Sequence, residues 1–534
     1  MKRLLFLILI FPAMQGFGQR PQILWQFSIK APAFGQAAVA DIDGDGKPEI
    51  VFSTYMNDGN VYALNAEDGS KLWSYQTGGC NDAAPIIADV NGDGYPEVIV
   101  ASSCVAKTFC LRGSDGHKLW ATLTGGTDSP PTIGDIDRDG KPEILHGQFD
   151  GSVICMNGED GSVKWTKMVD DSASIQTSAA LLDADGDGQL DFVVANWNYY
   201  NHNHIWAFRG DTRSQIWRSD VPGDVIYHGG SFADIDGDGK PELVFGCYDD
   251  HVYCLNAEDG SLKWAFDMGA YNYVGGPVVL ADINNDGHYE ILAAGWYQMK
   301  AISDSGTEVW SYNIPDYASC FRGPAIADIN NDGYLDLLFG TSSGKVIALS
   351  GPTGDTLWTM DLQALYGDTL DIDFAPVIAD FNGDGLLEGF VVGGYTGYPN
   401  ISNDYGRGYA FSLGSCVRPA LTMFQHDSVR SSHVPLDWPT SVPVTETGFP
   451  DITIFPNPVH DRFTLQFNPA ERTLLRLDLL SADGIKIARL FNRVIPPGPF
   501  SEKFDLSCSG LPDGVYLLQI RTGDKQRTVK LIRI

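Results

Sequence analysis

The amino-acid sequence predicts an all-β fold built from a repeated unit of four short strands. A nine-residue acidic loop of the form D-x-[DN]-x-D-G-x-x-[DE] occurs eight times, at intervals of 46 to 52 residues. A tryptophan follows seven of the eight loops, and no segment between residues 30 and 415 shows a helical period. Regular spacing on this scale is typical of repeat architectures, so the repeat itself sets the fold class.

The first unit indicates how each repeat is expected to fold. It reads QAAVADI, DGDGKPE, IVFSTY, MNDGN, VYALNA, EDGS, KLWSYQ, so four segments rich in Val, Ile, Tyr and Trp alternate with Gly, Asp and Asn turns. This pattern is typical of an antiparallel four-stranded meander, and VYALNA alternates with the period of two that marks a strand. Four strands in about 40 to 50 residues are typical of one blade of a β-propeller.

The tryptophans predict the number of blades. The eighth unit ends at GRGYAFSLGSC without a tryptophan segment, whereas Trp25 precedes the first acidic loop and lies one repeat interval before Trp73. We therefore expect an eight-bladed β-propeller whose ring is closed by the N-terminal strand, because closure removes exposed strand edges. The tryptophans expected in the fourth segment of a unit are Trp73, Trp120, Trp165, Trp217, Trp264, Trp310 and Trp358.

The acidic loops predict sites for a hard cation. Calcium binds six to eight oxygen atoms, several of them from carboxylates. Positions 1, 3, 5 and 9 of every loop are Asp, Asn or Glu, and the residue at position 7 can supply its backbone carbonyl. The next segment is predicted to be a strand and not a helix, which excludes an EF-hand. We expect up to eight structural Ca²⁺ ions, held by Asp41, Asp43, Asp45, Glu49, Asp89, Asn91, Asp93, Glu97, Asp135, Asp137, Asp139, Glu143, Asp183, Asp185, Asp187, Asp191, Asp234, Asp236, Asp238, Glu242, Asp282, Asn284, Asp286, Glu290, Asp328, Asn330, Asp332, Asp336, Asp380, Asn382, Asp384 and Glu388.

The net charge of −32 is concentrated in these loops. They hold 28 of the 68 acidic side chains, so eight divalent cations would reduce the net charge to about −16. The charge that remains is still acidic, whereas a nucleic-acid partner needs a basic face to neutralise its phosphates. The composition therefore excludes nucleic acid as the expected partner.

The N-terminus is predicted to be a signal peptide over residues 1–18. Lys2 and Arg3 form a basic start, an apolar run follows from Leu4 to Phe11, and Gly16 and Gly18 are small residues suited to a cleavage site. This run is too short to span a bilayer, and no other apolar run approaches membrane length. We expect an exported, soluble monomer with the propeller over residues 19–416.

The nine cysteines leave the disulfide pattern open. Cys110, Cys155 and Cys254 each lie ten residues before a repeat tryptophan, where other units have alanine. A small buried position that accepts Ala or Cys accounts for them without a bridge. A hairpin could instead bring Cys247 to Cys254, or Cys104 to Cys110.

Candidate ligand residues are expected at the blade ends opposite the acidic loops. Insertions rich in aromatic, Asn, His and Asp residues follow the second strand of blades four, six and eight: NWNYYNHNH, GWYQ and YTGYPNISNDY. Aromatic faces stack on sugar rings while amides bind hydroxyls, although these side chains could also pack on one another. The candidates are Trp197, Tyr199, Tyr200, His228, Tyr273, Trp296, Tyr297, Arg322, Tyr395 and Tyr398.

The C-terminal region differs from the repeats. Residues 417–450 are rich in proline and are expected to form a semi-rigid linker. Residues 451–534 have a balanced charge and several apolar strand-like segments, so we expect a small C-terminal β-sandwich.

Residues 22–416 resemble two known kinds of repeat. The acidic loops resemble the calcium-binding FG-GAP repeats of integrin alpha subunits and the VCBS repeats of bacterial surface proteins, and YALNAEDGSKLW is similar to the outer strands of quinoprotein-type propellers. The resemblance implies a calcium-loaded propeller that serves as an adhesion or carbohydrate-associated module. The quinone-binding residues of quinoproteins have no identifiable counterpart in the sequence.

Residues 451–534 resemble a type A sorting domain of the type IX secretion system. The segments that carry the resemblance are FPNPV at Phe455 to Val459, LPDGVY at Leu511 to Tyr516, and the basic C-terminus. The resemblance implies handling by the type IX machinery and export to the surface of a Gram-negative bacterium or into the medium, usually with removal of the domain. A substrate-binding sandwich is the alternative.

Two classes of function remain. No H-E-x-x-H, C-x-x-C or Walker motif occurs, so we predict no catalytic residues. The first hypothesis is a secreted or cell-surface binding protein for a glycan or a protein partner. The second is a polysaccharide-degrading enzyme that resembles rhamnogalacturonan lyases, which are eight-bladed propellers with similar loops; His228 and Arg322 are the nearest candidates for its base.

Overall fold

A computed structural model describes residues 21–416 apart from 199–201, 373 and 385, and parts of the C-terminal region. In that region it describes residues 453–455, 462–467, 469, 473–481, 486–495, 497–498, 500–505, 514–522 and 525–533. The chain forms two compact units, residues 1–436 and 437–534, and each is described by itself. The predicted signal peptide, the predicted linker, Tyr199 and Tyr200 lie outside the described residues.

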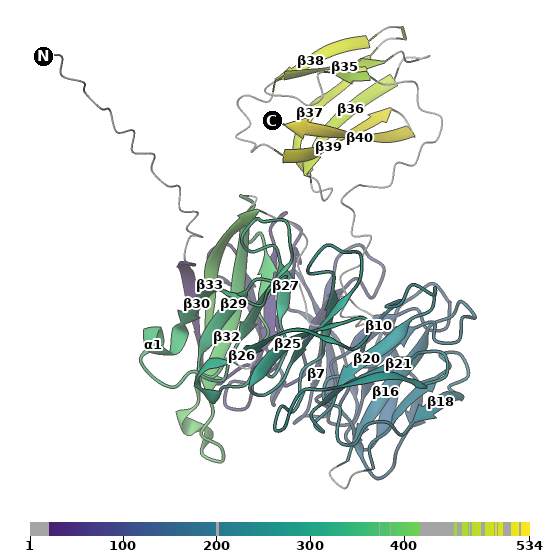
Figure 1. The fold of residues 1–534 in the computed structure, drawn as a ribbon, viewed down its shortest axis with the longest axis vertical. Helices are drawn as coiled ribbons and strands as arrows, with labels where there is room; N and C mark the ends of the chain where they lie inside the picture. The colour runs from purple at the N-terminus through teal and green to yellow at the C-terminus, as the bar shows by residue number, and fades with distance from the viewer. Residues whose placement is uncertain are drawn as a thin grey trace, which may run out of the picture. The chain divides into compact units, whose positions relative to one another are not determined.

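The first unit is an array of antiparallel sheets (Figure 1). In the first sheet, β2 (Ala38–Ala40), β3 (Glu49–Ser53), β4 (Asn60–Asn65) and β5 (Lys71–Gln76) pair in chain order, as the meander pattern predicted. Five further sheets have the same order: β6 (Ile86–Ala88), β7 (Glu97–Ser102), β8 (Lys107–Arg112) and β9 (Lys118–Leu123); β10 (Thr132–Gly134), β11 (Glu143–Gly147), β12 (Ser152–Asn157) and β13 (Val163–Met168); β19 (Ser231–Ala233), β20 (Glu242–Gly246), β21 (His251–Asn256) and β22 (Leu262–Asp267); β23 (Val279–Ala281), β24 (Glu290–Ala294), β25 (Gln298–Ser303) and β26 (Glu308–Asn313); β27 (Ala325–Ala327), β28 (Asp336–Gly340), β29 (Lys345–Leu349) and β30 (Thr356–Asp361).

Two sheets depart from this plan. One has five strands, because both β14 (Ser174–Ile175) and β15 (Ala180–Leu182) pair with β16 (Asp191–Trp197), which is followed by β17 (Ile205–Phe208) and β18 (Gln215–Ser219). The other has the order β1-β33-β32-β31 and contains β31 (Val377–Ala379), β32 (Leu386–Tyr395) and β33 (Tyr405–Cys416). Its outer strand is the N-terminal β1 (Ile23–Ile29), paired antiparallel with β33 as the sequence predicted.

Neighbouring sheets pack face to face through apolar side chains. One buried cluster joins the first sheet to the second, with Val51 and Val61 against Val98 and Phe109. Another cluster holds Phe52 of the first sheet together with residues of the last two sheets, among them Tyr409. The first strands also contact one another: β2 lies against both β6 and β31. The beginning and the end of the array therefore share one core.

Each repeat tryptophan lies in an outer strand, and six of the eight donate an indole N–H hydrogen bond to the next sheet. The indole N–H of Trp73 donates to the carbonyl of Gly113 at 2.6 Å, and the ring lies over Gly116. Gly116 has a positive φ of 67°, and an added Cβ would lie 2.7 Å from the ring, so this turn requires glycine. Trp25 makes the same contact from β1 to the first sheet, donating to the carbonyl of Ala66 at 2.8 Å. The other four bonds of this kind are made by Trp120, Trp217, Trp264 and Trp310.

The cysteines confirm one expectation and correct another. Cys110, Cys155 and Cys254 are fully buried free thiols, each paired across the ladder with a repeat tryptophan, as the small-position interpretation predicted. The suggested hairpin bridges are wrong: Cys104 forms a disulfide with Cys80, and Cys247 remains free. The connection between the first two sheets brings Cys80 to the hairpin that contains Cys104, a contact between units that local spacing does not reveal.

Helix is almost absent from the described residues. One α-helical turn, α1 (Leu362–Tyr366), begins after Asp361, whose side chain accepts a hydrogen bond from the backbone N–H of Ala364. It ends at Gly367, which has a left-handed conformation. Two short 3₁₀ turns are η1 (Pro315–Tyr317) and η2 (Ile401–Asn403). None of these described helices is long and apolar enough to cross a membrane.

The second unit contains two antiparallel sheets. One has the order β34-β35-β38, with β34 (Thr453–Phe455), β35 (Arg462–Phe467) and β38 (Phe500–Asp505). The other has the order β37-β36-β39-β40, with β36 (Thr473–Ser481), β37 (Lys486–Ile495), β39 (Gly514–Thr522) and β40 (Lys525–Arg533). Phe463 and Phe504 of the first sheet share one buried cluster with Leu477 and Leu518 of the second.

Candidate functional site

The acidic loops connect the first and second strands of each sheet and have one backbone pattern. In the first loop, the carboxylate of Asp41 accepts the N–H groups of Gly44 and Gly46 at 2.8 and 3.0 Å. Gly46 has a positive φ of 89°, which turns the chain back around that carboxylate. The carboxylate of Asp43 accepts from the N–H of Asp45 at 3.0 Å. The loop therefore gathers its carboxylates around one point.

The acid at position 9 is buried in every loop, and in the seventh loop Asp328 at position 1 is buried as well. Glu49 begins β3, is 1% exposed, and accepts the N–H of Ile42 at 2.9 Å. Burial, with a further contribution from the charges of the other loop aspartates, raises the pKa of Glu49 to about 7. The pKa of Asp336, at the same position of the seventh loop, is also raised to about 7, chiefly by burial. A divalent cation would offset both effects, because it favours the ionised carboxylate.

Four loops bring carboxylate oxygens close together, as the binding of a hard cation requires. Carboxylate oxygens from three residues lie within 4.8 Å of one another in the first, third, fourth and fifth loops. Oxygen donors of this type and density suit calcium. In the second and sixth loops position 3 is Asn, and its side-chain amide donates a hydrogen bond to the acid at position 9. Asn91 donates to Glu97 at 2.9 Å and Asn284 to Glu290 at 2.7 Å. The four carboxylate sets are Asp41, Asp43 and Asp45; Asp135, Asp137 and Glu143; Asp183, Asp185 and Asp191; and Asp234, Asp236 and Glu242.

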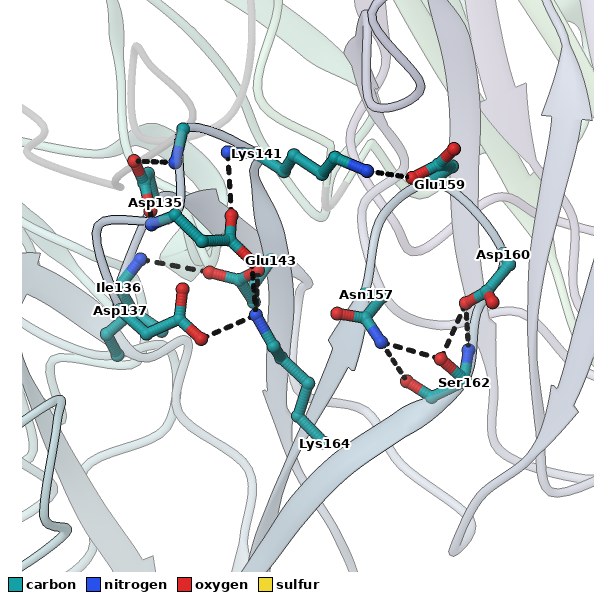
Figure 2. Close-up of polar contacts among 12 residues, drawn as sticks. Asp135, Ile136, Asp137, Lys141, Glu143, Asn157, Glu159, Asp160, Ser162 and Lys164 are labelled. Atoms are coloured by element: carbon teal, nitrogen blue, oxygen red, sulfur yellow. Dashed lines mark hydrogen bonds and ion pairs between the residues drawn. The ribbon is translucent and has the colours of Figure 1, made fainter.

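A basic side chain enters three of these sets. Figure 2 shows the third loop, where the Nζ of Lys164 on β13 lies 2.5 Å from Asp137 and 2.7 Å from the buried Glu143. Lys263 on β22 contacts Asp236 and Glu242 of the fifth loop in the same way. In the fourth loop, Arg209 pairs with Asp185 and Asp187.

The opposite ends of the sheets carry a cluster of aromatic side chains, which we call the aromatic surface: Trp197, Tyr227, Tyr248, Tyr273 and Trp296. All five are half-buried. The ring centroid of Trp197 lies 4.8 Å from that of Tyr227 and 5.6 Å from that of Tyr248. Tyr273 lies 5.9 Å from Tyr248 and 5.0 Å from Trp296, so the rings form a continuous series.

Three predicted ligand residues of blades four to six therefore belong to the aromatic surface, and Tyr297 adjoins it at 6.3 Å from Trp296. The buried indole N–H of Trp296 has no hydrogen-bond partner among the described residues. Two members of the aromatic surface, Tyr227 and Tyr248, were not among the predicted candidates, although Tyr227 directly precedes the candidate His228. Their pairing with Trp197 is visible only in three dimensions.

His228 and Arg322 lie beside this surface but are buried. The guanidinium of Arg322 donates to the Nε2 of His228 at 2.5 Å and lies over the rings of Tyr227 and Phe321. Burial, together with the Arg322 charge, lowers the pKa of His228 well below its usual value, so the imidazole is neutral. Burial also raises the pKa of Tyr227 to about 12.

A pair of interacting carboxyls, Asp82 and Asp128, lies within the field of Arg322. Burial, reinforced by the charge of Asp128, raises the pKa of Asp82 to about 8. Burial also raises the pKa of Asp128, although the Arg322 charge opposes this. One oxygen of each carboxyl is buried without a hydrogen-bond partner in the described part of the chain. The prediction missed this pair, because each aspartate stands singly in a connection between sheets and matches no motif.

The remaining predicted ligand residues lie elsewhere. Tyr395 of β32 stacks on Tyr405, with 5.7 Å between centroids, and Tyr398 is 70% exposed in the following loop. Neither has a ring contact with the aromatic surface in the described chain. Near the blade-four insertion, a groove of about 640 Å³ is lined by Asp170, His202, His204, Trp206 and other residues. It lies against the outer strands of two sheets.

Two regions of the chain match known families. Residues 41–100, 89–146, 183–245 and 234–293 match the FG-GAP-like repeat, and residues 453–534 match the secretion system C-terminal sorting domain. The chain therefore contains four FG-GAP-like repeats. More particularly, it joins those repeats to a type IX secretion sorting domain, which indicates export by that system. No curated protein matches the chain by sequence.

Solved structures resemble the chain in fold. Quinohemoprotein alcohol dehydrogenase from Comamonas testosteroni is 13% identical, with a TM-score of 0.53 over 76% of this chain and 79% of its own. Saccharomyces cerevisiae Sqt1 is 12% identical, with a TM-score of 0.53 over 73% and 98% of the two chains. A europium-containing methanol dehydrogenase is 14% identical, with a TM-score of 0.51 over 74% and 93%. At these identities the likeness shows the fold alone, which is a β-propeller.

Proposed function

We propose that this protein is a secreted or cell-surface binding module, a calcium-stabilised propeller whose aromatic surface binds glycans. The observation that carries the proposal is the continuous series of half-buried rings from Trp197 to Trp296, at the sheet ends opposite the acidic loops. These rings meet one another edge-on or tilted, and an exposed aromatic face can stack on the apolar face of a sugar ring.

The scaffold we propose is an eight-bladed ring closed by the N-terminal strand. Its support is the pairing of β1 with β33, the contact between β2 and β31, and the bond from Trp25 to Ala66. The eight acidic loops then lie on one face, and in the loops that bind calcium the ion would neutralise carboxylates that repel one another. The ions would thus stabilise the blades, and the ligand would bind on the other face.

The proposal also includes the domain boundaries of the chain and its route of export. The domains would be a signal peptide (1–18), the propeller (19–416), a linker (417–450) and the sorting domain (451–534), folded as a small sandwich around the cluster that contains Phe463. The type IX machinery of a Gram-negative bacterium would carry the monomeric chain across the outer membrane. The partner of the mature protein would then be an extracellular glycan, with a protein surface as the alternative.

A polysaccharide lyase is the weaker candidate. Its base would have to be His228 or Arg322, but the Nε2 of His228 accepts from Arg322 and the imidazole is 2% exposed. A buried imidazole engaged in this way is poorly placed to remove a proton from a polymer. No observation of the described residues favours the enzyme over the binding module.

A glycan array tests the proposal. The purified chain in calcium should bind at least one glycan class, and Trp296→Ala should lose the signal. Tyr95→Ala is the matched control, because Tyr95 is a 60% exposed aromatic residue in an acidic loop and its removal should change nothing. An assay for unsaturated sugars released from pectic polymers runs beside the array. Release of product, or equal loss of binding in both variants, would overturn the proposal.

A further inference from the structure

The eight acidic loops differ in what lies over them. The residue before each repeat tryptophan is Lys164 in the third sheet and Lys263 in the fifth. At the same place the other six outer strands have an apolar residue: Leu24, Leu72, Leu119, Ile216, Val309 and Leu357. A cationic side chain at this place is therefore particular to two blades.

Both lysines reach the interior of the ligand set. Lys164 contacts position 3 (Asp137, 2.5 Å), position 5 (Asp139, 3.2 Å) and position 9 (Glu143, 2.7 Å) of its loop. Lys263 contacts position 3 (Asp236) and position 9 (Glu242, 2.8 Å) of its own. The position 9 carboxylates are each 1% exposed, so the ammonium is their charge partner inside the fold.

These contacts differ from those of the lysines that stand in the third and fifth loops themselves. Lys141, at position 7, turns away from the ligand set and pairs with Glu159 at 2.5 Å (Figure 2). Lys240, at position 7 of the fifth loop, pairs with Glu258 at 2.9 Å. Those pairs lie on the surface. A lysine near an acidic loop therefore does not by itself contact the ligand set. The position before the tryptophan of the outer strand is the one that places the Nζ among the ligand oxygens.

An ammonium and a calcium ion cannot both use the same oxygens. Calcium requires six to eight oxygens at about 2.3–2.6 Å, whereas the Nζ of Lys164 already lies within hydrogen-bond distance of three of the four side-chain ligands of its loop. Bringing a divalent ion into that set would add repulsion between two cations at close range. The residues of the third and fifth loops thus do not fit a calcium ion as those of the first loop do.

We propose that Lys164 and Lys263 replace the metal in the third and fifth loops, so that these two blades are neutralised by their own chain and bind no calcium. The first loop, whose ligand set receives no lysine or arginine in the described chain, keeps its need for the ion. The fourth loop stays outside the proposal, because Arg209 forms no ion pair there with the buried Asp191 in the described chain. The inference rests on the proposed calcium binding of the remaining loops.

The test is the number of calcium ions bound by the full-length chain, measured by equilibrium dialysis against ⁴⁵Ca²⁺ at saturation. The expected result is no more than six ions for the wild type and two more for the double variant Lys164→Met, Lys263→Met. The matched control is Lys141→Met, Lys240→Met, which removes the same charge from the same loops and should leave the number unchanged. The single variant Lys164→Met should gain one ion, which guards against a double variant that does not fold.

The possible results distinguish a failure of the replacement by lysine from a failure of the proposed calcium binding. Eight ions bound by the wild type, an unchanged number in the double variant, or an equal gain in the control would each overturn the replacement by lysine while leaving calcium binding intact. No ion bound by either the wild type or the double variant would overturn the calcium-stabilised scaffold as well. Thermal unfolding in a chelator gives a second readout: the double variant should melt earlier than the control, and calcium should restore it.

Discussion

The closure of the ring can be tested at Trp25. Its indole N–H donates to the carbonyl of Ala66 at 2.8 Å, a bond between the N-terminal strand and the first sheet, and Ala66 is fully buried. Trp25→Phe keeps an aromatic ring but leaves that buried carbonyl without its donor, at a cost of about 1–3 kcal/mol in the free energy of unfolding. Trp73 makes the corresponding bond to Gly113 between two sheets that are consecutive in the chain.

The test compares the loss of stability caused by the same substitution at Trp25 and at Trp73. If the ring is closed, Trp25→Phe and Trp73→Phe should lower the urea midpoint by similar amounts, measured by far-UV circular dichroism at saturating calcium. Trp358→Phe is the control, because Trp358 has no hydrogen bond of this kind to a following sheet in the described chain. A clear loss for Trp73→Phe with no change for Trp25→Phe would refute closure by the N-terminal strand.

Three further predictions concern calcium, pH and the disulfide. Asp41→Ala should lower the melting temperature in calcium more than Asp43→Asn, because Asp41 holds two backbone N–H groups and four loops already have Asn at position 3; equal losses would contradict the assigned roles. The pKa of Asp82 is raised from 3.8 to about 8 in the fold, so its contribution to stability is present below about pH 4 and lost as the pH rises through about 8. Asp82→Asn should therefore melt above the wild type beyond pH 8 and close to it near pH 4, and a difference independent of pH would contradict the assignment. Replacing Cys80 and Cys104 by Ser should cost about 3 kcal/mol in urea unfolding, since the bridge closes a loop of 24 residues; a loss no larger than that of Cys110→Ser would contradict a stabilising role.

The features that repeat were predictable from the sequence. The acidic loops, the four-strand units and the outer-strand tryptophans recur at fixed spacing, and each copy supports the interpretation of the others. The partner of β1 was predictable for the same reason, because Trp25 keeps the repeat spacing although it precedes the first loop. The small position shared by Ala63 and Cys110 followed from their common distance to a tryptophan.

The features that do not recur in every repeat were not predictable. Asp82 and Asp128 lie in different connections and interact only because the sheets bring those connections together. Cys80 and Cys104 meet for the same reason. The position of Lys164 beside Trp165 in the sequence does not reveal its contact with Glu143. That contact forms only because the fourth strand of the sheet lies over the acidic loop that precedes the second strand. Tertiary contact, and not local pattern, sets these three arrangements.

We propose that blade six holds a metal in its acidic loop at one end of the sheet and contributes Trp296 to the ligand-binding surface at the other end. The most direct measurement is the dissociation constant for the strongest array glycan at saturating calcium, compared between Trp296→Ala and Asp286→Asn. We expect Trp296→Ala to weaken glycan binding by at least roughly tenfold, about 1.4 kcal/mol. We expect Asp286→Asn to lower the melting temperature and to leave glycan binding unchanged. Binding that survives Trp296→Ala and is lost with Asp286→Asn would contradict the proposal.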